Sequence, residues 1–223
     1  MDQIVANFFD LEVMARYLPD ILSGFVLTIY LAVAIVLFGL ALGLALAVVR
    51  AFQIRPLNWL IVFFVDLFRA LPPLVIMIIF YFALPYVGVE LGGFVAAWLA
   101  LGFVLAAFAE EIYWAGILSV DKGQWEAARS TGLPFFRTLR SVVLPQALRL
   151  TIPPLTNRTI AITKGTALAS VVAVPEILSQ ATAAQAFAAN TSPLTMGAIA
   201  YLILFAPLVT LSRWIETRFA WRR

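Results

Sequence analysis

The chain has 223 residues, of which 63% are hydrophobic and only 12% are charged. A soluble domain of this size needs a charged exterior, so these proportions exclude one and indicate a protein that has lipid as its solvent. Cysteine and histidine are both absent, which excludes thiol nucleophiles, disulfides and zinc sites of the Cys/His type. The carboxylates are not clustered, so we expect no metal site. We attribute the net charge of +3 to basic cytoplasmic loops rather than to nucleic-acid binding.

Apolar stretches predict an all-α integral membrane protein with about five spans, because a bilayer core of about 30 Å needs roughly 20 helical residues per crossing. Residues 1–20 are acidic and lack the basic start and apolar stretch of a secretory signal, so we expect them to be retained as an extracytoplasmic segment. The predicted spans are Ile21–Val49, Leu57–Leu84, Phe94–Ile117, Ile160–Leu178 and Thr195–Ser212. Together they define a transmembrane domain over residues 21–215, followed by a tail over 216–223.

The first predicted span contains a stripe of small residues. Gly39, Gly43 and Ala47 recur every four positions, so they lie on one face of the helix. Small residues in this pattern let a second helix approach closely. We therefore interpret the stripe as a packing surface rather than as the lining of a pore.

The basic residues predict the orientation of the chain. With the amino terminus outside, twelve Lys and Arg residues face inward and only Arg16 faces outward, while Arg69 and Lys164 lie within spans. The inward-facing set is Arg50, Arg55, Lys122, Arg129, Arg137, Arg140, Arg149, Arg158, Arg213, Arg218, Arg222 and Arg223. This bias follows the positive-inside rule, and it predicts that the carboxyl terminus and the polar stretch over 118–158 are cytoplasmic.

The polar stretch over 118–158 predicts a helical hairpin. Glu126–Thr131 is a good helix segment with an acid in its first turn, Gly132 can end a helix in the left-handed conformation, and Pro134 can open a second helix. We expect that helix to stop or kink at Pro145. Such a hairpin suits either the docking of a cytoplasmic protein or adsorption to anionic lipid through its arginines, with its sharp turn favouring the protein.

This hairpin resembles the EAA loop of permease subunits in binding-protein-dependent ABC importers. The resemblance is carried by Glu126-Ala127-Ala128, Gly132 and Val142-Val143-Leu144-Pro145, with Val142 where the family usually has Ile. Phe68-Arg69-Ala70-Leu71-Pro72 and Lys164-Gly165-Thr166-Ala167-Leu168 are similar to elements of its polar amino acid branch. The chain departs from that branch at Trp114, commonly arginine, at Ala70-Leu71, usually Gly-Thr, and at Ala167, usually serine.

The resemblance implies a permease subunit in a bacterial inner membrane that carries amino acids or similar polar solutes and catalyses no reaction itself. Glu126, Ala127, Ala128, Gly132, Leu144 and Pro145 would couple it to cytoplasmic ATPase subunits, which would bind ATP and Mg, while the chain itself would bind no cofactor. Its other partners would be a second permease subunit, identical or paralogous, and an extracytoplasmic solute-binding protein.

Ionisable and polar residues inside the predicted spans are candidates for the solute pathway, because such groups are costly in lipid unless they are paired or face water. The candidates are Asp66, Arg69, Glu110, Glu111, Thr163, Lys164 and Thr166. We expect Asp66 and Arg69 to pair with each other, three residues apart on one helix. Glu110 and Glu111 either pair with Arg69 or Lys164 or meet the solute, and Glu176 either contacts an outer protein or anchors its helix.

Two other functions compete with the permease interpretation. A self-sufficient channel or secondary transporter is disfavoured, because the sequence has no evident internal repeat and few intramembrane acids. A membrane-embedded enzyme is disfavoured because no plausible catalytic set is present. The sequence also lacks the G-x-x-x-x-G-K-[ST] nucleotide-binding loop, so ATP hydrolysis would have to come from another chain.

Overall fold

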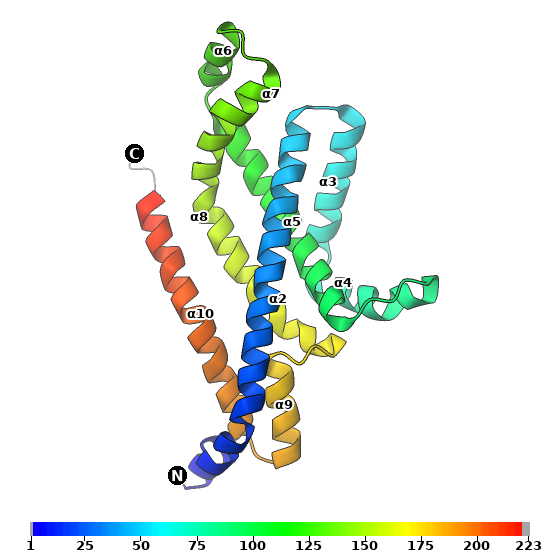
Figure 1. The fold of residues 1–223 in the computed structure, drawn as a ribbon, viewed down its shortest axis with the longest axis vertical. Helices are drawn as coiled ribbons and strands as arrows, with labels where there is room; N and C mark the ends of the chain where they lie inside the picture. Colours follow the sequence, from blue (N-terminus) through cyan, green and yellow to red (C-terminus); the bar gives the residue numbers. More distant parts are fainter. Residues whose placement is uncertain (1, 220–223) are drawn as a thin grey trace. The chain divides into compact units, whose positions relative to one another are not determined.

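The computed structural model describes residues 2–219, and this part of the chain contains helices and no strand (Figure 1). The α-helices are α1 (Asp2–Phe8), α2 (Leu11–Ala51), α3 (Arg55–Ala70), α4 (Pro73–Ile78), α5 (Gly93–Ser119), α6 (Lys122–Ser130), α7 (Phe135–Thr138), α8 (Leu144–Thr163), α9 (Ile177–Ala188) and α10 (Ser192–Phe219). Ile79–Ala83 and Leu139–Val143 are π-helical, and Leu84–Val87 and Lys164–Val172 are 3₁₀-helical. Arg222 and Arg223, which we counted as inward-facing, lie outside the described residues.

The helices supply the predicted membrane spans. Within the described residues, Gln3–Ala51, Gly93–Ser119 and Ser192–Arg218 are long and apolar enough to cross a membrane unaided. Two bent pairs also pass this test, Arg55–Ala70 with Pro73–Val87 at 103° and Phe135–Val172 with Ile177–Ala188 at 45°. Counting each bent pair as one span gives five, the number that the sequence predicted.

The second predicted span is not one continuous helix. It breaks after Ala70, where Leu71 takes an extended backbone with φ −88° and ψ 136°. The residue before a proline is driven out of the helical region by the proline ring, and here Pro72 and Pro73 follow in succession. The sequence prediction weighed the apolar character of this stretch and overlooked the proline pair, which turns the chain before α4 begins.

The fourth span begins earlier than predicted. Helical structure starts at Phe135 and runs without interruption to Val172, so the second half of the expected polar loop belongs to a long helix. Pro145 neither stops nor breaks it, contrary to our expectation. A π-helical turn over Leu139–Val143 precedes it, with the Leu144 N–H bonded to the Leu139 carbonyl. The wider turn fits a residue that lacks an N–H and crowds the preceding turn.

The chain divides into two compact units that are described separately. Unit 1 contains residues 1–37, 72–102 and 160–210, and unit 2 contains residues 38–71, 103–159 and 211–223. The core of unit 1 gathers Ile21, Ile177, Ala181, Met196 and Ala200, from α2, α9 and α10. Apolar side chains from distant parts of the sequence thus hold this unit together.

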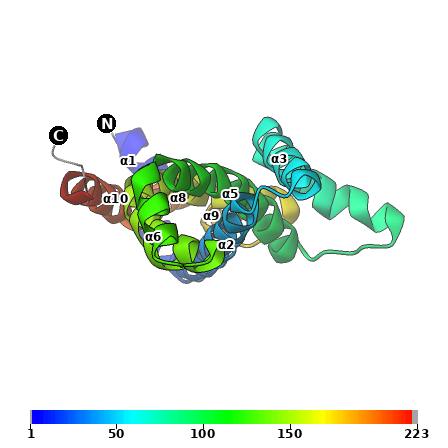
Figure 2. The ribbon, with the colours of Figure 1, turned by 90° about the horizontal axis from the view of Figure 1, so that it is seen from above.

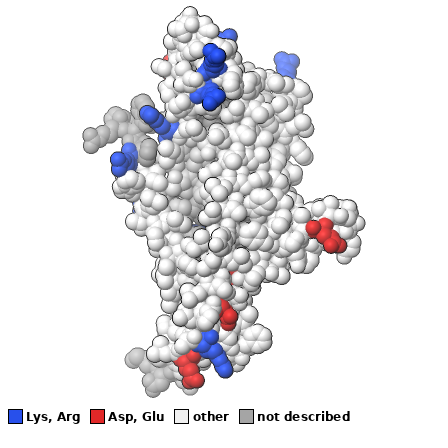
Figure 3. Space-filling view, in the orientation of Figure 1, with Lys and Arg blue, Asp and Glu red and all other residues white. Residues whose placement is uncertain are grey.

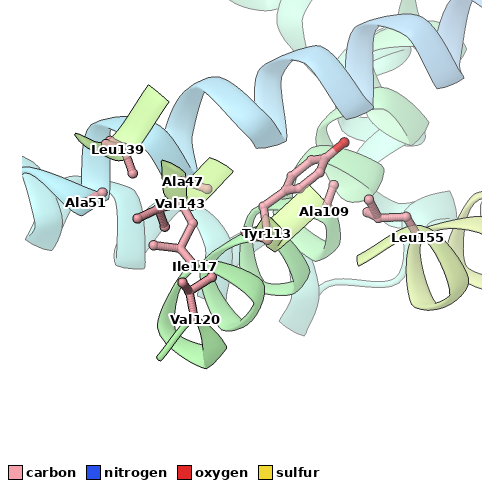
Figure 4. Close-up of a cluster of buried hydrophobic side chains, with 10 residues drawn as sticks. Ala47, Ala51, Ala109, Tyr113, Ile117, Val120, Leu139, Val143 and Leu155 are labelled. Carbon is pink, nitrogen blue, oxygen red and sulfur yellow. The ribbon is translucent and has the colours of Figure 1, made fainter. Parts of the chain in front are cut away.

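The core of unit 2 joins α2, α5 and the segment from Leu139 to Leu155, as Figure 4 shows. Its buried members are Ala47, Ala51, Ala109, Tyr113, Ile117, Val120, Leu139, Val143, Ala147 and Leu155. The small-residue stripe packs here, as predicted. A Cβ on Gly39 would lie 2.7 Å from the Leu105 side chain, and one on Gly43 would lie 2.8 Å from the Ala106 carbonyl oxygen.

Candidate functional site

The predicted hairpin is formed by α6 and α7 in unit 2, and Figure 2 views it from above. α6 begins at Lys122 because Asp121 caps it, accepting a hydrogen bond from the Gly123 N–H at 2.7 Å. Glu126 therefore lies in the second turn of the helix and not in the first, which corrects our placement of the acid. The acid that satisfies the free N–H groups of this helix is Asp121.

The turn between the two helices has the predicted glycine geometry. Gly132 has φ +85°, and its N–H donates to the Arg129 carbonyl at 3.0 Å. A Cβ at this position would meet nothing within 4 Å, so only the backbone conformation selects glycine here. Pro134 then precedes α7 with an extended backbone, as expected of a proline that opens a helix.

The residues expected to contact an ATPase are mainly exposed. Glu126, Ala127, Gly132 and Pro145 lie on the surface, Leu144 is half-buried and Ala128 is buried. Basic side chains surround them and form the blue cluster at the top of Figure 3. The exposed basic residues of α6, α7 and the π-helical segment that follows are Lys122, Arg129, Arg137 and Arg140. The hairpin therefore carries several exposed basic groups.

Aromatic rings pack against one another at the base of the hairpin. Trp125 of α6 stacks on Phe135 with ring centroids 5.5 Å apart, and Phe52, just beyond α2, lies 5.4 Å from Phe135. A cavity of about 330 Å³ opens beside them, and Trp114 and Glu126 are among its lining residues. These rings connect α6 to the ends of α2 and α5.

Glu110 pairs with Arg50, one of the basic residues that we expected to face inward. Its carboxylate accepts bonds from Arg50 Nη1 at 3.0 and 3.1 Å. The Glu110 side chain is wholly buried and the Arg50 side chain is 21% exposed. Arg50 also lies 4.9 Å from the ring centroid of Trp114. The pair is a satisfied buried ion pair that joins α2 to α5.

Arg69 pairs with Glu111, one of the two structural arrangements that we had weighed for the adjacent acids. Among the described residues it does not pair with Asp66, so that prediction is wrong, and Asp66 is exposed. The guanidinium groups of Arg69 and Arg158 lie 5.3 and 3.8 Å from the ring centroid of Phe108. Unit 2 thus holds a second charged cluster whose paired side chains are about one-third exposed, at 34% and 40%.

Thr163, Lys164 and Thr166 lie in unit 1, where α8 gives way to the 3₁₀ segment. Thr166 is buried and its hydroxyl donates to the Thr163 carbonyl at 2.8 Å. The Thr163 hydroxyl donates to the Ile160 carbonyl at 3.1 Å. Both hydroxyls thus bond within their own helix, as threonine commonly does in membrane helices. Lys164 is exposed.

Glu176 anchors its helix, one of the two roles that we considered. It is fully buried, which excludes contact with an outer protein in this conformation. Its carboxylate accepts from the N–H groups of Ser179 at 2.7 Å and Leu178 at 3.0 Å, and also from the Tyr201 hydroxyl. The Ile177 N–H donates to Thr28 Oγ1 at 3.3 Å. Side chains therefore satisfy the first three N–H groups of α9 at a depth where lipid offers no partner.

Sequence reasoning missed two features of these sites. Asp121 could have been found, because an aspartate directly before a helix is a preferred cap. The pairing of Arg50 with Glu110 could not, since the two residues are 60 positions apart. Their contact depends on how α2 packs against α5, and a single sequence does not specify that.

These features define an integral membrane protein with an exposed helical hairpin and with charged pairs held among its helices. Residues 36–221 match the family of binding-protein-dependent transport system inner membrane components. The chain belongs to this family, and it is the permease component of an ABC importer in a bacterial inner membrane.

Individual relatives cover most of the chain. It is 34% identical over 173 residues to the probable amino-acid ABC transporter permease protein YckA of Bacillus subtilis, covering 78% of this chain and 76% of that one. It is 32% identical to the arginine transport system permease protein ArtQ of the same organism, covering 94% and 96%. Its fold is similar to a solved amino acid ABC transporter crystallised with histidines, with a TM-score of 0.84, 30% identity and coverage of 94% and 98%.

Proposed function

We propose that this chain forms the translocation pathway for amino acids or related polar solutes and is driven by a separate ATPase that docks on the α6–α7 hairpin. The relatives named above are permeases for amino acids, including arginine. The observation that carries the docking role is the exposed surface of Glu126, Ala127 and Gly132 at the tip of a rigidly capped hairpin.

The exposure of α6 favours a protein partner over a lipid surface. Ala128 is buried and Trp125 is half-buried, whereas Lys122, Glu126 and Arg129 are exposed and the only exposed apolar side chain of α6 is the small Ala127. A helix that adsorbs to lipid needs the opposite arrangement, with its apolar face available to the acyl chains. A polar surface that mixes basic groups with Glu126 suits a groove on a protein.

The orientation of the chain and the other subunits of the transporter follow from this assignment. The amino terminus faces outward and the hairpin faces the cytoplasm, where ATP is found. The chain has no catalytic activity and holds no cofactor, and ATP and Mg bind to the ATPase. A second permease subunit, identical or paralogous, completes the pathway, and an extracytoplasmic solute-binding protein delivers the solute.

Replacing Gly132 with leucine tests the docking role. Leucine at φ +85° is strained, so the turn should distort and release the ATPase while the spans remain inserted. Gly88 provides a matched control, because it has φ +84° and likewise has nothing within 4 Å of its Cβ position. Co-purification and solute-stimulated ATP hydrolysis should fall for Gly132→Leu and for Glu126→Lys, and should stay normal for Gly88→Leu. Normal stimulated hydrolysis in Gly132→Leu would refute the docking role.

A further inference from the structure

Stability alone does not explain why the ion pair of Arg50 and Glu110 is buried among the helices. Glu110 is wholly buried, and both of its oxygens are bonded to the same Arg50 nitrogen at 3.0 and 3.1 Å. Apolar residues of similar size often stabilise such a position as well as an ion pair does. An ionisable pair among membrane-spanning helices is therefore a candidate for function.

Two short series of residues lead from the docking hairpin toward this pair. On one side, Trp125 stacks on Phe135, and Phe135 contacts Phe52, which lies two residues after Arg50. On the other side, Trp114 lines the same cavity as Trp125, and its ring lies 4.9 Å from the Arg50 guanidinium. Both routes end at Arg50, and every residue in them belongs to unit 2.

The helices on either side of the pair are closely packed. A Cβ on Gly43 of α2 would lie 2.8 Å from the Ala106 carbonyl oxygen and 3.0 Å from the Glu110 nitrogen of α5. Beyond the pair, Gln53 holds the turn before α3 with φ 56°, an uncommon conformation for a residue with a side chain. Phe52 thus lies between this strained turn and the part of α2 that packs closely on α5.

We propose that the Arg50–Glu110 ion pair is a positioning element that transmits movement of the α6–α7 hairpin to α2 and α5. The two bonds from Nη1 to the carboxylate hold the Arg50 guanidinium beside Trp114, and Phe52 follows Arg50 by two residues. This inference rests on the proposed docking of an ATPase at Glu126 and Gly132. It adds the residues through which the hairpin acts once the ATPase is bound.

The test uses the complete transporter in proteoliposomes with its ATPase and solute-binding protein. Glu110→Gln should keep the ATPase bound and basal hydrolysis normal, but should lower both the maximal hydrolysis stimulated by loaded binding protein and solute uptake by roughly tenfold. The concentration of binding protein that gives half-maximal stimulation should not change. Glu90→Gln, which removes the same charge from an exposed site in unit 1, should behave as the unaltered protein does.

A double variant separates positioning from simple charge neutralisation. Arg50→Met with Glu110→Met removes both charges and should fold, yet should stay uncoupled because neither side chain directs the hairpin contacts. Full stimulation in this variant would overturn the proposal, as would loss of the bound ATPase in Glu110→Gln. Phe52→Leu covers the case in which the Glu110 variants fail to fold. It leaves the ion pair in place and should reduce stimulation, so normal stimulation there would also overturn the proposal.

The two proposals fail in different ways. If the hairpin does not dock an ATPase, Gly132→Leu and Glu126→Lys keep a full complement of bound ATPase. If docking is correct but transmission is not, those variants lose the ATPase while Glu110→Gln remains fully stimulated.

Discussion

Glu176 makes most of the side-chain hydrogen bonds at the break before α9. Membrane helices can be interrupted only where other groups satisfy the freed backbone, and here the carboxylate takes two N–H groups and a tyrosine hydroxyl. Ala173 ends the preceding helical segment with φ 59°, which is unfavourable for a residue with a side chain. The bonds to Glu176 offset that strain.

Replacing Glu176 with alanine should destabilise the protein by about 1–3 kcal/mol, because it removes a helix cap and leaves the Tyr201 hydroxyl without its acceptor. Thermal unfolding of the detergent-purified transporter would measure the effect as a lower midpoint. Tyr201→Phe should lower the midpoint less, since both backbone bonds to Glu176 survive. Equal midpoints for Glu176→Ala and the unaltered protein would show that the break is held by other contacts.

The sequence showed which ionisable residues lie within the helices, but it predicted only part of their pairing. Glu111 with Arg69 was among the weighed pairings, and the structure contains it. Asp66 with Arg69 seemed natural at a spacing of three, yet the arginine turns to another helix. Pairing is decided by the rotation of each helix within the bundle, and the sequence pattern of α5, which is apolar on nearly all sides, does not record that rotation.

Close packing at the level of helices is concentrated along Gly39, Gly43 and Ala47. Gly43→Val should destabilise unit 2 by about 1–3 kcal/mol, because its Cβ would lie 2.7 Å from that of Ala109 and 2.8 Å from a carbonyl oxygen. Gly92→Val is the matched control, since a Cβ there meets nothing within 4 Å. A lower unfolding midpoint for Gly43→Val alone is expected, and equal midpoints for the two variants would contradict close packing.

The existence of the apolar helices was clear from composition, whereas their interruptions were not. Counting apolar residues gave five stretches, because hydropathy is insensitive to a backbone break. The bend of 103° between α3 and α4 comes from two adjacent prolines. At Pro145 the opposite happens, since a π-turn keeps the helix continuous. Proline therefore marks where a helix must adapt, while the surrounding packing decides whether it bends.

For the whole molecule, the assignment as a permease subunit makes transport depend on other chains. The purified chain alone in liposomes should show no solute uptake, with or without ATP, because its sequence lacks a nucleotide-binding loop. Adding the ATPase and the solute-binding protein should restore ATP-dependent uptake, measured with a radiolabelled amino acid. Uptake by the isolated chain would favour a self-sufficient channel or secondary transporter instead.

The bond between Glu176 and Tyr201 also bears on how the protein is made. Synthesis proceeds from the amino terminus, and Tyr201 lies 25 residues after Glu176. The ribosome therefore releases the acid before the residue that completes its hydrogen bonding. Glu176 lacks one of its hydrogen-bond partners until the first turns of α10 have emerged from the ribosome. The hydrogen bonding of Glu176 is therefore completed only after most of the chain has been made.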